Sequence, residues 1–486
     1  MNQNFINKNQ LVGLVEKHFF NDISENSIIK EQDSWELLTP NRLDVCFKIF
    51  FLKKKDKISN SEKFYSEHIS VMTNGLFREY GNSKKNSFKV FLKNFIDLEK
   101  AMDKNYFDEL KSIIPLGRNN TIIDGAHRLS ISILKNIKIK TLNINVEDSK
   151  YNWRFFLERG IKLDDIEIAV SEFCNYNKKI HASLIWPVSK EYNSKIIDEF
   201  DPDSIVYIKK IKVSNQSIKN ILVQVYKDHS WLGKIESGYD GIVSKFAKIY
   251  KPHGEMTLIF FTSSTLNQVI ELKEKIRTRI GIDKHSIHIT DNQKESIIVS
   301  EIFLNKNSLE FYNNSNNFKY PKSYKLFNSF KQDLLSKGLN LNDFIIVGSM
   351  PFSLQGITEA NDIDFLTTTN YIPINKKFNS HNKYLKDYKL KMNDIIYDPK
   401  NYFIYDGVKF MSNKLNLKFK KNRGEVKDKL LIKKINQGKS LDVVFLQIEN
   451  YVINLKYKFI ALAINYSKLT GTYSFFKFIY KKIKLF

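Results

Sequence analysis

Residues 343–369, DFIIVGSMPFSLQGITEANDIDFLTTT, constrain the fold of this chain more than any other stretch. An apolar run typical of a buried strand ends at Gly348 and Ser349, and a second such run further on contains Asp362 and Asp364. Because side chains alternate between the two faces of a strand, both aspartates are expected on one face. Two adjacent carboxylates repel each other unless a cation lies between them. The spacing therefore predicts a cation site, and Mg²⁺ with phosphate co-ligands suits such a pair.

The Gly-Ser turn adds a second element to this pattern, because exposed backbone N–H groups and a hydroxyl suit a phosphate tail. Gly348-Ser349, a short spacer and Asp362-x-Asp364 on a strand together resemble the nucleotidyltransferase superfamily of the DNA polymerase β type, over residues 325–435. The resemblance implies that the Gly-Ser pair holds the triphosphate of an NTP and that the aspartates hold Mg²⁺. A surface hairpin that carries two acidic residues is the alternative.

Members of this superfamily usually carry a third carboxylate on a neighbouring strand. The candidates in residues 392–412 are Asp394, Asp398 and Asp406. Asp398 precedes a proline and Asp406-Gly407 is a hairpin-turn signal, whereas Asp394 directly precedes a strand-like Ile-Ile-Tyr. Asp394 is therefore the candidate third catalytic residue. Without a third acid the site would bind nucleotide but lack the base that activates the incoming hydroxyl.

A second motif lies in residues 113–136, IIPLGRNNTIIDGAHRLSISILKN. The pattern predicts a short strand, a break at Asp124-Gly125 and a helix that begins directly afterwards. A glycine turn into a helix N-terminus offers free N–H groups and partial positive charge. His127 and Arg128 fall in the first helical turn, where cations are unfavourable for the helix dipole. Their position indicates that they grip an anion.

The Gly-x-His-Arg turn resembles the ParB/sulfiredoxin superfamily over residues 60–145. The resemblance implies that the turn, with Asp124, Gly125, His127 and Arg128, binds nucleotide phosphates. The superfamily includes nucleotide-dependent DNA-partition proteins, an ATP-using cysteine sulfinic reductase and free-serine kinases. The reductase needs a cysteine in the turn, where this chain has an alanine, so that activity is not expected. A purely structural strand–turn–helix with solvated His and Arg is the alternative.

The middle of the chain predicts an alternation of strands and helices. Strands are expected at 181–190, 218–227, 256–264 and 285–291, and helices at 267–281 and 292–305. This order is typical of an α/β layout with a mainly parallel sheet. Nearer the N-terminus, residues 44–53 also predict a strand.

His285 and His288 lie in the last of those expected strands. They fall on opposite faces by parity, which disfavours a shared metal, and Asp291 and Glu295 suit a helix start instead. A ligand at the strand end remains an option for the face of His288. The glycine-containing residues 228–248, with Lys234 and Lys245 among them, could cradle a phosphorylated substrate but match no motif.

Composition limits the class of partner. The 486 residues carry a formal net charge of +24, with a pI near 9.5, which predicts attraction to nucleic acid, nucleotides or an anionic membrane surface. Cys46 and Cys174 form no disulfide or zinc pattern, so a reducing cytoplasm is expected. No secretory signal layout and no run of eighteen apolar residues occurs, so no transmembrane helix is expected.

Positive charge is concentrated towards the C-terminus. From Lys409 onwards there are eighteen Lys and Arg against four Asp and Glu. Residues 420–435 fit one basic helix. The last residues, 475–486, alternate aromatic and basic side chains, which suits an anionic membrane surface on the inner face of the cell or nucleic acid. A solvated face enriched in lysine by compositional bias is the alternative.

The predicted fold is multidomain, α/β and α+β. It comprises a ParB-like phosphate-binding domain at 1–150, an α/β middle domain at 151–325, a polymerase-β-like nucleotidyltransferase domain at 326–435 and a basic helical tail at 436–486. The predicted function is Mg²⁺-dependent nucleotidyl transfer from an NTP to a small-molecule or glycan acceptor, as in cell-surface polysaccharide biosynthesis. The alternatives are a ParB-like, nucleic-acid-associated nucleotide-binding protein and a non-catalytic scaffold with two degenerate sites.

Overall fold

A computed structural model describes residues 4–437 of the chain, except 13–14, 16, 80–83, 105–112, 235–238, 252–253 and 318, together with 466 and 470–472. The described residues form two compact units. The first runs to Tyr176 but omits Lys53–Ser59, and the second contains Lys53–Ser59 and runs on from Asn177. The chain is mixed α/β with three sheets, as expected. Most of the predicted tail, including all of 475–486, lies outside the described residues.

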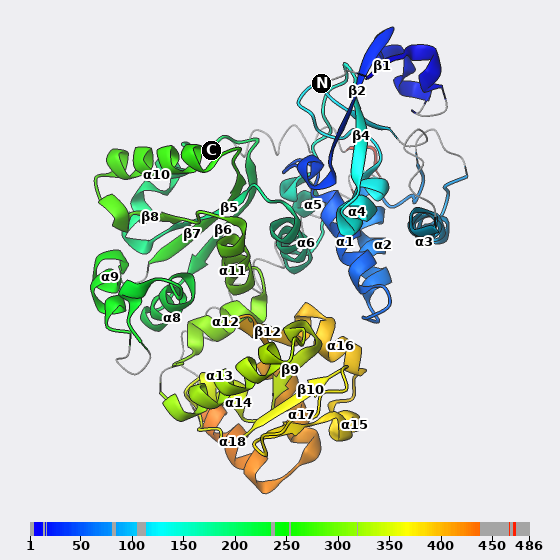
Figure 1. Ribbon diagram of the computed structural model, residues 1–486. Helices are drawn as coiled ribbons and strands as arrows, with labels where there is room; N and C mark the ends of the chain where they lie inside the picture. The colour runs from blue at the N-terminus through cyan, green and yellow to red at the C-terminus, as the bar shows by residue number, and fades with distance from the viewer. Residues whose placement is uncertain are drawn as a thin grey trace. The chain divides into compact units, whose positions relative to one another are not determined.

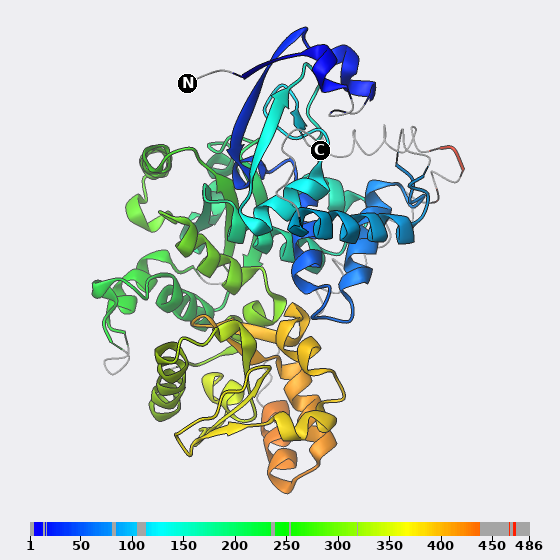
Figure 2. The same ribbon diagram turned by 45° about the vertical axis from the view of Figure 1, so that its right-hand side comes forward.

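The first unit is built on a four-stranded sheet of order β1-β2-β4-β3, in which only β3 and β4 are parallel neighbours. Its strands are β1 (Asn4–Asn7), β2 (Asn26–Asp33), β3 (Ile114–Leu116) and β4 (Lys138–Asn143). Its helices are α1 (Asp44–Lys54), α2 (Ser61–Met72), α3 (Phe88–Lys104), α4 (Ala126–Lys135), α5 (Trp153–Glu158) and α6 (Leu163–Tyr176). Figures 1 and 2 show β2 and β4 side by side, as their ladder requires. Helices α5 and α6 thus belong to this unit, although the sequence suggested a boundary at residue 150.

The prediction of a strand over residues 44–53 is wrong, because this segment forms α1. Every residue from Asp44 to Leu52 is buried, so the helix has no polar face that would reveal its period. A continuous apolar run buried on all sides has the same pattern in a strand as in a helix. The helical spacing also lets Lys48 reach back to Asp44, whose carboxylate lies 3.0 Å from the lysine Nζ.

The second unit begins with a sheet of order β6-β7-β5-β8 in which all three ladders are antiparallel. Its strands are β5 (Ile180–Ile185), β6 (Ile205–Lys212), β7 (Glu255–Thr262) and β8 (Ile287–Ile289). The prediction of a mainly parallel sheet is therefore wrong. Strands joined by a helix, β5 with β6 and β7 with β8, do run in the same direction, but another strand lies between them. This order is that of a split βαβ arrangement.

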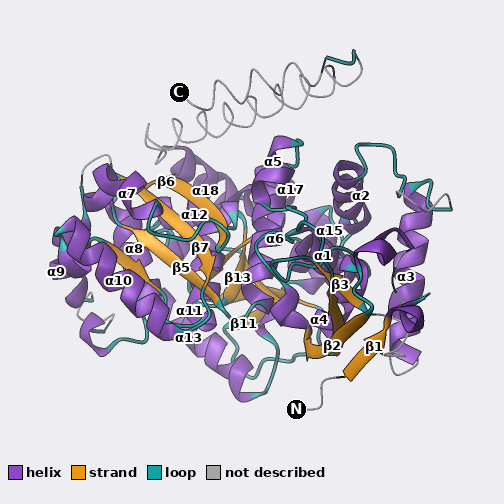
Figure 3. Cartoon of the chain, turned by 90° about the horizontal axis from the view of Figure 1, so that it is seen from above, coloured by secondary structure: helices purple, strands orange, loops and turns teal. Residues whose placement is uncertain are grey.

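Helices cover both faces of this antiparallel sheet. Helices α7 (Asn193–Ile197) and α10 (Leu266–Ile280) pack on the face that carries Ile259 and Ile287. Figure 1 shows α8 (Asn215–Val225) and α10 on either side of the strands of this sheet, and Figure 3 shows β6, β7 and β5 next to one another. The prediction of a strand over 218–227 is wrong, because α8 occupies this segment. The remaining helices here are α9 (Gly241–Ile249), α11 (Gln293–Phe303) and α12 (Lys306–Asn314).

The C-terminal part of the second unit contains a five-stranded mixed sheet of order β11-β10-β9-β13-β12. Its strands are β9 (Phe344–Val347), β10 (Ile363–Thr367), β11 (Phe378–Ser380), β12 (Tyr402–Tyr405) and β13 (Val408–Met411). Its helices are α13 (Pro321–Ser336), α14 (Met350–Leu354), α15 (Leu385–Tyr388), α16 (Met392–Tyr397), α17 (Asn413–Arg423) and α18 (Val426–Gln437). Asp406 and Gly407, both with positive φ, form the two-residue turn between β12 and β13, so the predicted hairpin is confirmed. Within the described residues no helix is long and apolar enough to cross a membrane.

The turn at Asp406 also holds charged groups together within the second unit. The carboxylate of Asp406 lies 3.2 Å from Lys227 Nζ and 2.8 Å from Lys331 Nζ. Asp406 and Lys227 line a cavity of about 270 Å³, and Glu301 of α11 lines it as well. Burial, only partly offset by the nearby lysines, raises the pKa of the Glu301 carboxyl to about 7. Glu301 is therefore the titratable group of this cluster near neutral pH.

We expect Glu301→Gln to remove the loss of folding stability that ionisation of this buried carboxyl causes as pH rises. The pKa of about 7 in the folded protein exceeds the ordinary 4.5, so the folded state binds this proton more tightly than the unfolded state. The contribution of Glu301 to stability is present at acidic pH and is lost as pH rises through 7. The melting temperature of the variant, relative to wild type, should be higher at pH 8 than at pH 5, by the equivalent of about 1–3 kcal/mol. The exposed Glu271→Gln controls for the change in net charge, and an offset independent of pH would contradict the assignment.

Candidate active site

The turn after β9 lies directly against one of the predicted aspartates. Gly348 has φ +72°, and a Cβ atom on it would lie only 2.2 Å from Oδ2 of Asp364. The cause is the antiparallel ladder of β9 and β10, which places Val347 opposite Asp364. The carbonyl oxygen of Gly348 accepts a hydrogen bond of 3.0 Å from the buried Asn416 side chain of α17. Only a residue without a side chain fits this position, and the contact brings the Gly-Ser turn and the Asp-x-Asp strand together.

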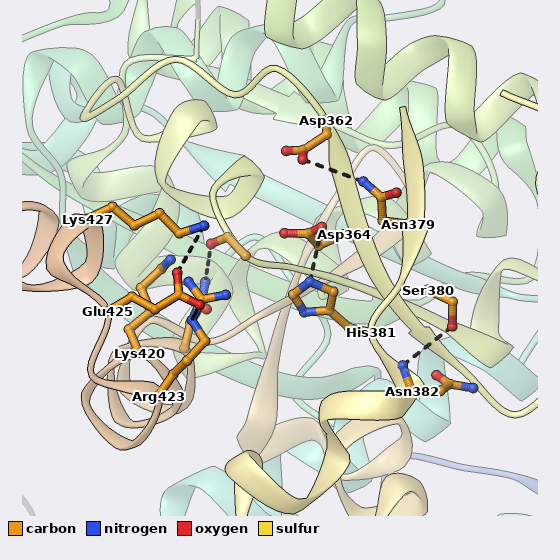
Figure 4. A network of polar contacts seen from close by, with 12 residues as sticks. Asp362, Asp364, Asn379, Ser380, His381, Asn382, Lys420, Arg423, Glu425 and Lys427 are labelled. Atoms are coloured by element: carbon orange, nitrogen blue, oxygen red, sulfur yellow. Dashed lines mark hydrogen bonds and ion pairs between the residues drawn. The ribbon is translucent and has the colours of Figure 1, made fainter. Parts of the chain in front are cut away.

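Asp362 and Asp364 lie close together at the start of β10. Figure 4 shows both carboxylates on the side of the strand that faces Asn379 and His381. Burial and then the negative charge of Asp364 raise the pKa of Asp362. The two carboxylates therefore repel each other, as the sequence spacing predicted for a pair on one strand face.

Strand β11 and the residue that follows it supply two polar side chains that the sequence analysis missed. The strand pairs in parallel with β10, with Asn379 opposite Asp364. Asn379 Nδ2 lies 3.5 Å from Oδ2 of Asp362, and His381 Nε2 lies 3.1 Å from Oδ1 of Asp364. The other ring nitrogen of His381 is 3.2 Å from the hydroxyl of Tyr388. An amide on the neighbouring strand and an imidazole just beyond its end thus lie where the family pattern leads one to expect a carboxylate.

The structure does not bring Asp394 to this pair. Asp394 lies in the first turn of α16, not beside a strand. Tyr397 of the same helix bonds to Asp343, at 2.7 Å, and to Thr368, at 2.8 Å, with its hydroxyl. Those two residues flank the ends of β9 and β10 that are opposite to Gly348 and Asp364. Asp394 therefore lies on the helix at the opposite end of these two strands from Gly348 and Asp364.

The two further acidic candidates are also engaged elsewhere. Asp398 caps a short 3₁₀ helix, where its side chain accepts a hydrogen bond from the Lys400 N–H. Asp406 occupies the β12–β13 turn described above. Among the described residues, none of the three candidates contacts the aspartate pair.

Basic side chains of α17 and α18 lie beside the two aspartates and influence their electrostatics. Residues 420–435 are not one helix as predicted, because Gly424, with φ +73°, ends α17 and α18 begins at Val426. Figure 4 shows the resulting group of charged side chains beside Asp362 and Asp364, and the positive charge of Lys427 lowers the pKa of Asp362 against the two larger raising effects. A Gly after a lysine-rich run is the sequence signal that could have revealed this break.

An ion pair holds this basic group in place. The carboxylate of Asp428 lies 2.8 Å from Arg423 Nη2 and 3.1 Å from Lys420 Nζ. These contacts hold the pKa of Asp428 below its ordinary value even though burial opposes this. Lys427 pairs with Glu425 at 3.0 Å. Asp428 of α18 thereby orients the two cations of α17, and Glu425 of the turn between the helices orients Lys427.

Around Gly125 of the first unit the structure has the predicted turn and helix, but residues 121–123 form no strand, and only Ile122 makes an isolated bridge, to Leu116. The polar groups of the turn are engaged internally. Gly125, with φ +85°, immediately precedes α4. His127 Nε2 lies 2.7 Å from the hydroxyl of Tyr65, and burial lowers the pKa of the imidazole, so it is neutral at pH 7. Arg128 Nη2 lies 3.1 Å from Oδ2 of Asp124. His127 therefore does not supply the positive charge that the sequence suggested.

The residues of the aspartate site fit Mg²⁺ in part. Within the part of the chain that the structure describes, no group of three or more His, Cys, Asp or Glu side chains is placed to hold a metal ion. Two carboxylates suffice for Mg²⁺ when substrate phosphates and water complete its octahedron. Comparison of the chain with protein-family models, with curated proteins and with solved structures finds no match. The assignment of the site therefore rests on its own geometry.

We expect Gly348→Ala to destabilise the protein more than Gly407→Ala. Both glycines have φ +72°, but a Cβ on Gly407 would have nothing within 4 Å, whereas one on Gly348 would collide with Asp364. The left-handed backbone costs each variant about 1–2 kcal/mol, and only Gly348→Ala carries the additional collision. Thermal unfolding of both variants measures the difference. Equal losses, or no recovery in the Gly348→Ala/Asp364→Ala double variant, would show that the turn does not lie against Asp364.

Proposed function

We propose that the C-terminal part of the second unit transfers a nucleotidyl group from an NTP to the hydroxyl of a small-molecule or glycan acceptor, with Mg²⁺ held by Asp362 and Asp364. The observation that carries the proposal is the close approach of the Gly348 turn to Asp364. It brings the backbone of the Gly-Ser turn against one of the two carboxylates, and Ser349 follows directly in the chain. A phosphate tail and its divalent cation need these two kinds of group side by side.

Each part of the site has a defined task in this reaction. The turn at Gly348 and Ser349 binds the terminal phosphates through backbone N–H groups and the serine hydroxyl. When bound, Mg²⁺ offsets the charge that builds up on the transferring phosphoryl group. Arg423 and Lys427 add positive potential on the same side. His381, tied to Tyr388, holds the Asp364 carboxylate in a fixed orientation through the contact of 3.1 Å.

The bond changes balance without a third carboxylate. The acceptor oxygen forms a bond to the α-phosphorus, the bond from that phosphorus to the bridging oxygen breaks, and pyrophosphate leaves with the electron pair. Asn379 on the neighbouring strand cannot take up a proton, and both ring nitrogens of His381 are engaged, with Asp364 and with Tyr388. The proton of the acceptor hydroxyl therefore passes to solvent water. This arrangement favours acceptors whose hydroxyl group needs little activation.

We expect Asp362→Asn/Asp364→Asn to abolish Mg²⁺-dependent NTP binding while the fold persists. The double variant removes both charges but keeps the shape of each side chain. Calorimetric titration of the full-length protein with each NTP, with and without Mg²⁺, measures the effect, and circular dichroism checks the fold. Asp394→Asn is the matched control and should bind like wild type, because the helix of Asp394 lies at the opposite end of strands β9 and β10.

Two results would overturn the proposal. One is unchanged metal-dependent binding in the double variant. The other is the lack of stabilisation of the wild type by any NTP with Mg²⁺, since a ligand of the native state raises the melting temperature by mass action. High affinity for duplex DNA that falls steeply with salt, with no NTP turnover, would favour the nucleic-acid-associated alternative.

A further inference from the structure

The antiparallel sheet of the second unit borders a cavity of about 550 Å³ at its β8 edge. Residues from α9, α10 and β8 line it, together with the 3₁₀ helix Ser230–Leu232. The segment 228–248 and the His288 face of the last strand, two separate features of the sequence, thus meet at one place. The volume lies in the range of small-molecule sites.

The cavity is strongly basic. Five cationic side chains line it, namely Lys245, Lys248, Lys273, Arg277 and Lys284. The acids that line it are Asp291 and Glu295, so the cations exceed the acids by three. Asp291 pairs with Lys273 at 2.8 Å, and Glu295 accepts hydrogen bonds from Asp291 N–H and from the Asn292 side chain at the start of α11. Asp291 thus offsets the charge of Lys273, and Arg277 pairs with Glu274 at 2.6 Å. The other lining cations are Lys245, whose Nζ donates a hydrogen bond of 2.9 Å to the Lys284 carbonyl, Lys248 and Lys284, and they outnumber Glu295.

The pKa of His288, a histidine that lines this cavity, is lowered in part by the positive charges around it. His288 of β8 projects from the face opposite to Ile287, towards Tyr226 at the end of α8, and its Nδ1 lies 3.1 Å from the tyrosine hydroxyl. Burial and then the charges of Lys273 and Lys245 lower its pKa to about 3. His288 is therefore neutral and serves as a hydrogen-bonding and stacking group rather than as a cation.

One wall of the cavity is aromatic. The ring of Tyr226 lies 5.0 Å from that of Trp231, 5.4 Å from that of His229 and 4.9 Å from that of His288, all at steep angles. Trp231 remains 43% exposed, which is high for a residue of its size. A partly exposed indole beside clustered cations offers a stacking surface for a ring next to a binding place for an anion.

We propose that this cavity binds a phosphorylated ligand that carries a ring, either a nucleoside monophosphate or a sugar phosphate. The phosphate lies against Lys245 and Lys248 of α9, and the ring lies against Trp231. None of the residues that line the cavity belongs to the aspartate site, and no cation is needed to hold the ligand. The inference goes beyond nucleotidyl transfer and stands or falls independently of it.

The test is calorimetric titration of the full-length protein in EDTA at low ionic strength. The probes are UMP, glucose 1-phosphate and inorganic phosphate. We expect one or both ring-bearing probes to bind at least about tenfold more tightly than inorganic phosphate, because only these probes carry a ring that can stack on Trp231. The probe that binds more tightly identifies the source of the phosphate. Binding should persist in Asp362→Asn/Asp364→Asn, which separates this site from the proposed active site.

Variants locate the ligand within the cavity. Lys245→Ala/Lys248→Ala should weaken every probe by about tenfold or more, because charge-assisted hydrogen bonds are lost. Trp231→Ala should weaken only the ring-bearing probes. Lys195→Ala is the matched control, since Lys195 is exposed on α7 and does not line the cavity. Equal affinity for all three probes, no binding of any probe, equal losses in the control variant, or binding of an oligonucleotide in place of the monophosphates would overturn the proposal.

Discussion

The antiparallel pairing of β9 with β10 is the constraint on which the candidate active site depends. Residues Phe344–Val347 are all buried, and so are Ile363 and Phe365 on the partner strand. A shift of β10 by one residue would turn Ile363 and Phe365 to the face of the aspartates and the aspartates into the core. The hydrophobic core thereby holds Gly348 against Asp364. The polar groups of the site are therefore positioned by the packing of apolar side chains.

The residues around Asp362 and Asp364 keep these two carboxylates close together although they repel each other. Asp362 and Asp364 are kept close at the start of one strand, at the cost of a raised pKa for Asp362. His381 contacts one carboxylate, and the α17–α18 pair brings Arg423 and Lys427 to the same side (Figure 4). Because Arg423 pairs with Asp428 of α18 and Lys427 pairs with Glu425 of the turn between the two helices, the site keeps a defined charge pattern. Such preorganised charge is what transfer of a phosphoryl group requires.

The large positive charge of the chain is only partly organised. Much of the +24 is spread over exposed lysines, where compositional bias explains it as well as function does. Among the residues that the structure describes, two groups of cations differ, namely the α17–α18 group beside the aspartates and the cavity at the β8 edge. In both, cations adjoin groups of another kind, carboxylates in the first and aromatic rings in the second. Such combinations select particular anions, whereas scattered charge attracts any polyanion.

The sequence by itself determined the features that depend on neighbours along the chain. The period of two placed Asp362 and Asp364 together, and Asp406-Gly407 specified a hairpin. Only the tertiary structure decided which strands are neighbours. The pairing of β11 with β10 brought Asn379 and His381 to the site, and the insertion of β7 between β5 and β6 made the middle sheet antiparallel. Likewise, total burial hid the helical nature of α1. Local spacing assigns faces within one element, but contacts between elements depend on packing across distant parts of the chain, which no local pattern records.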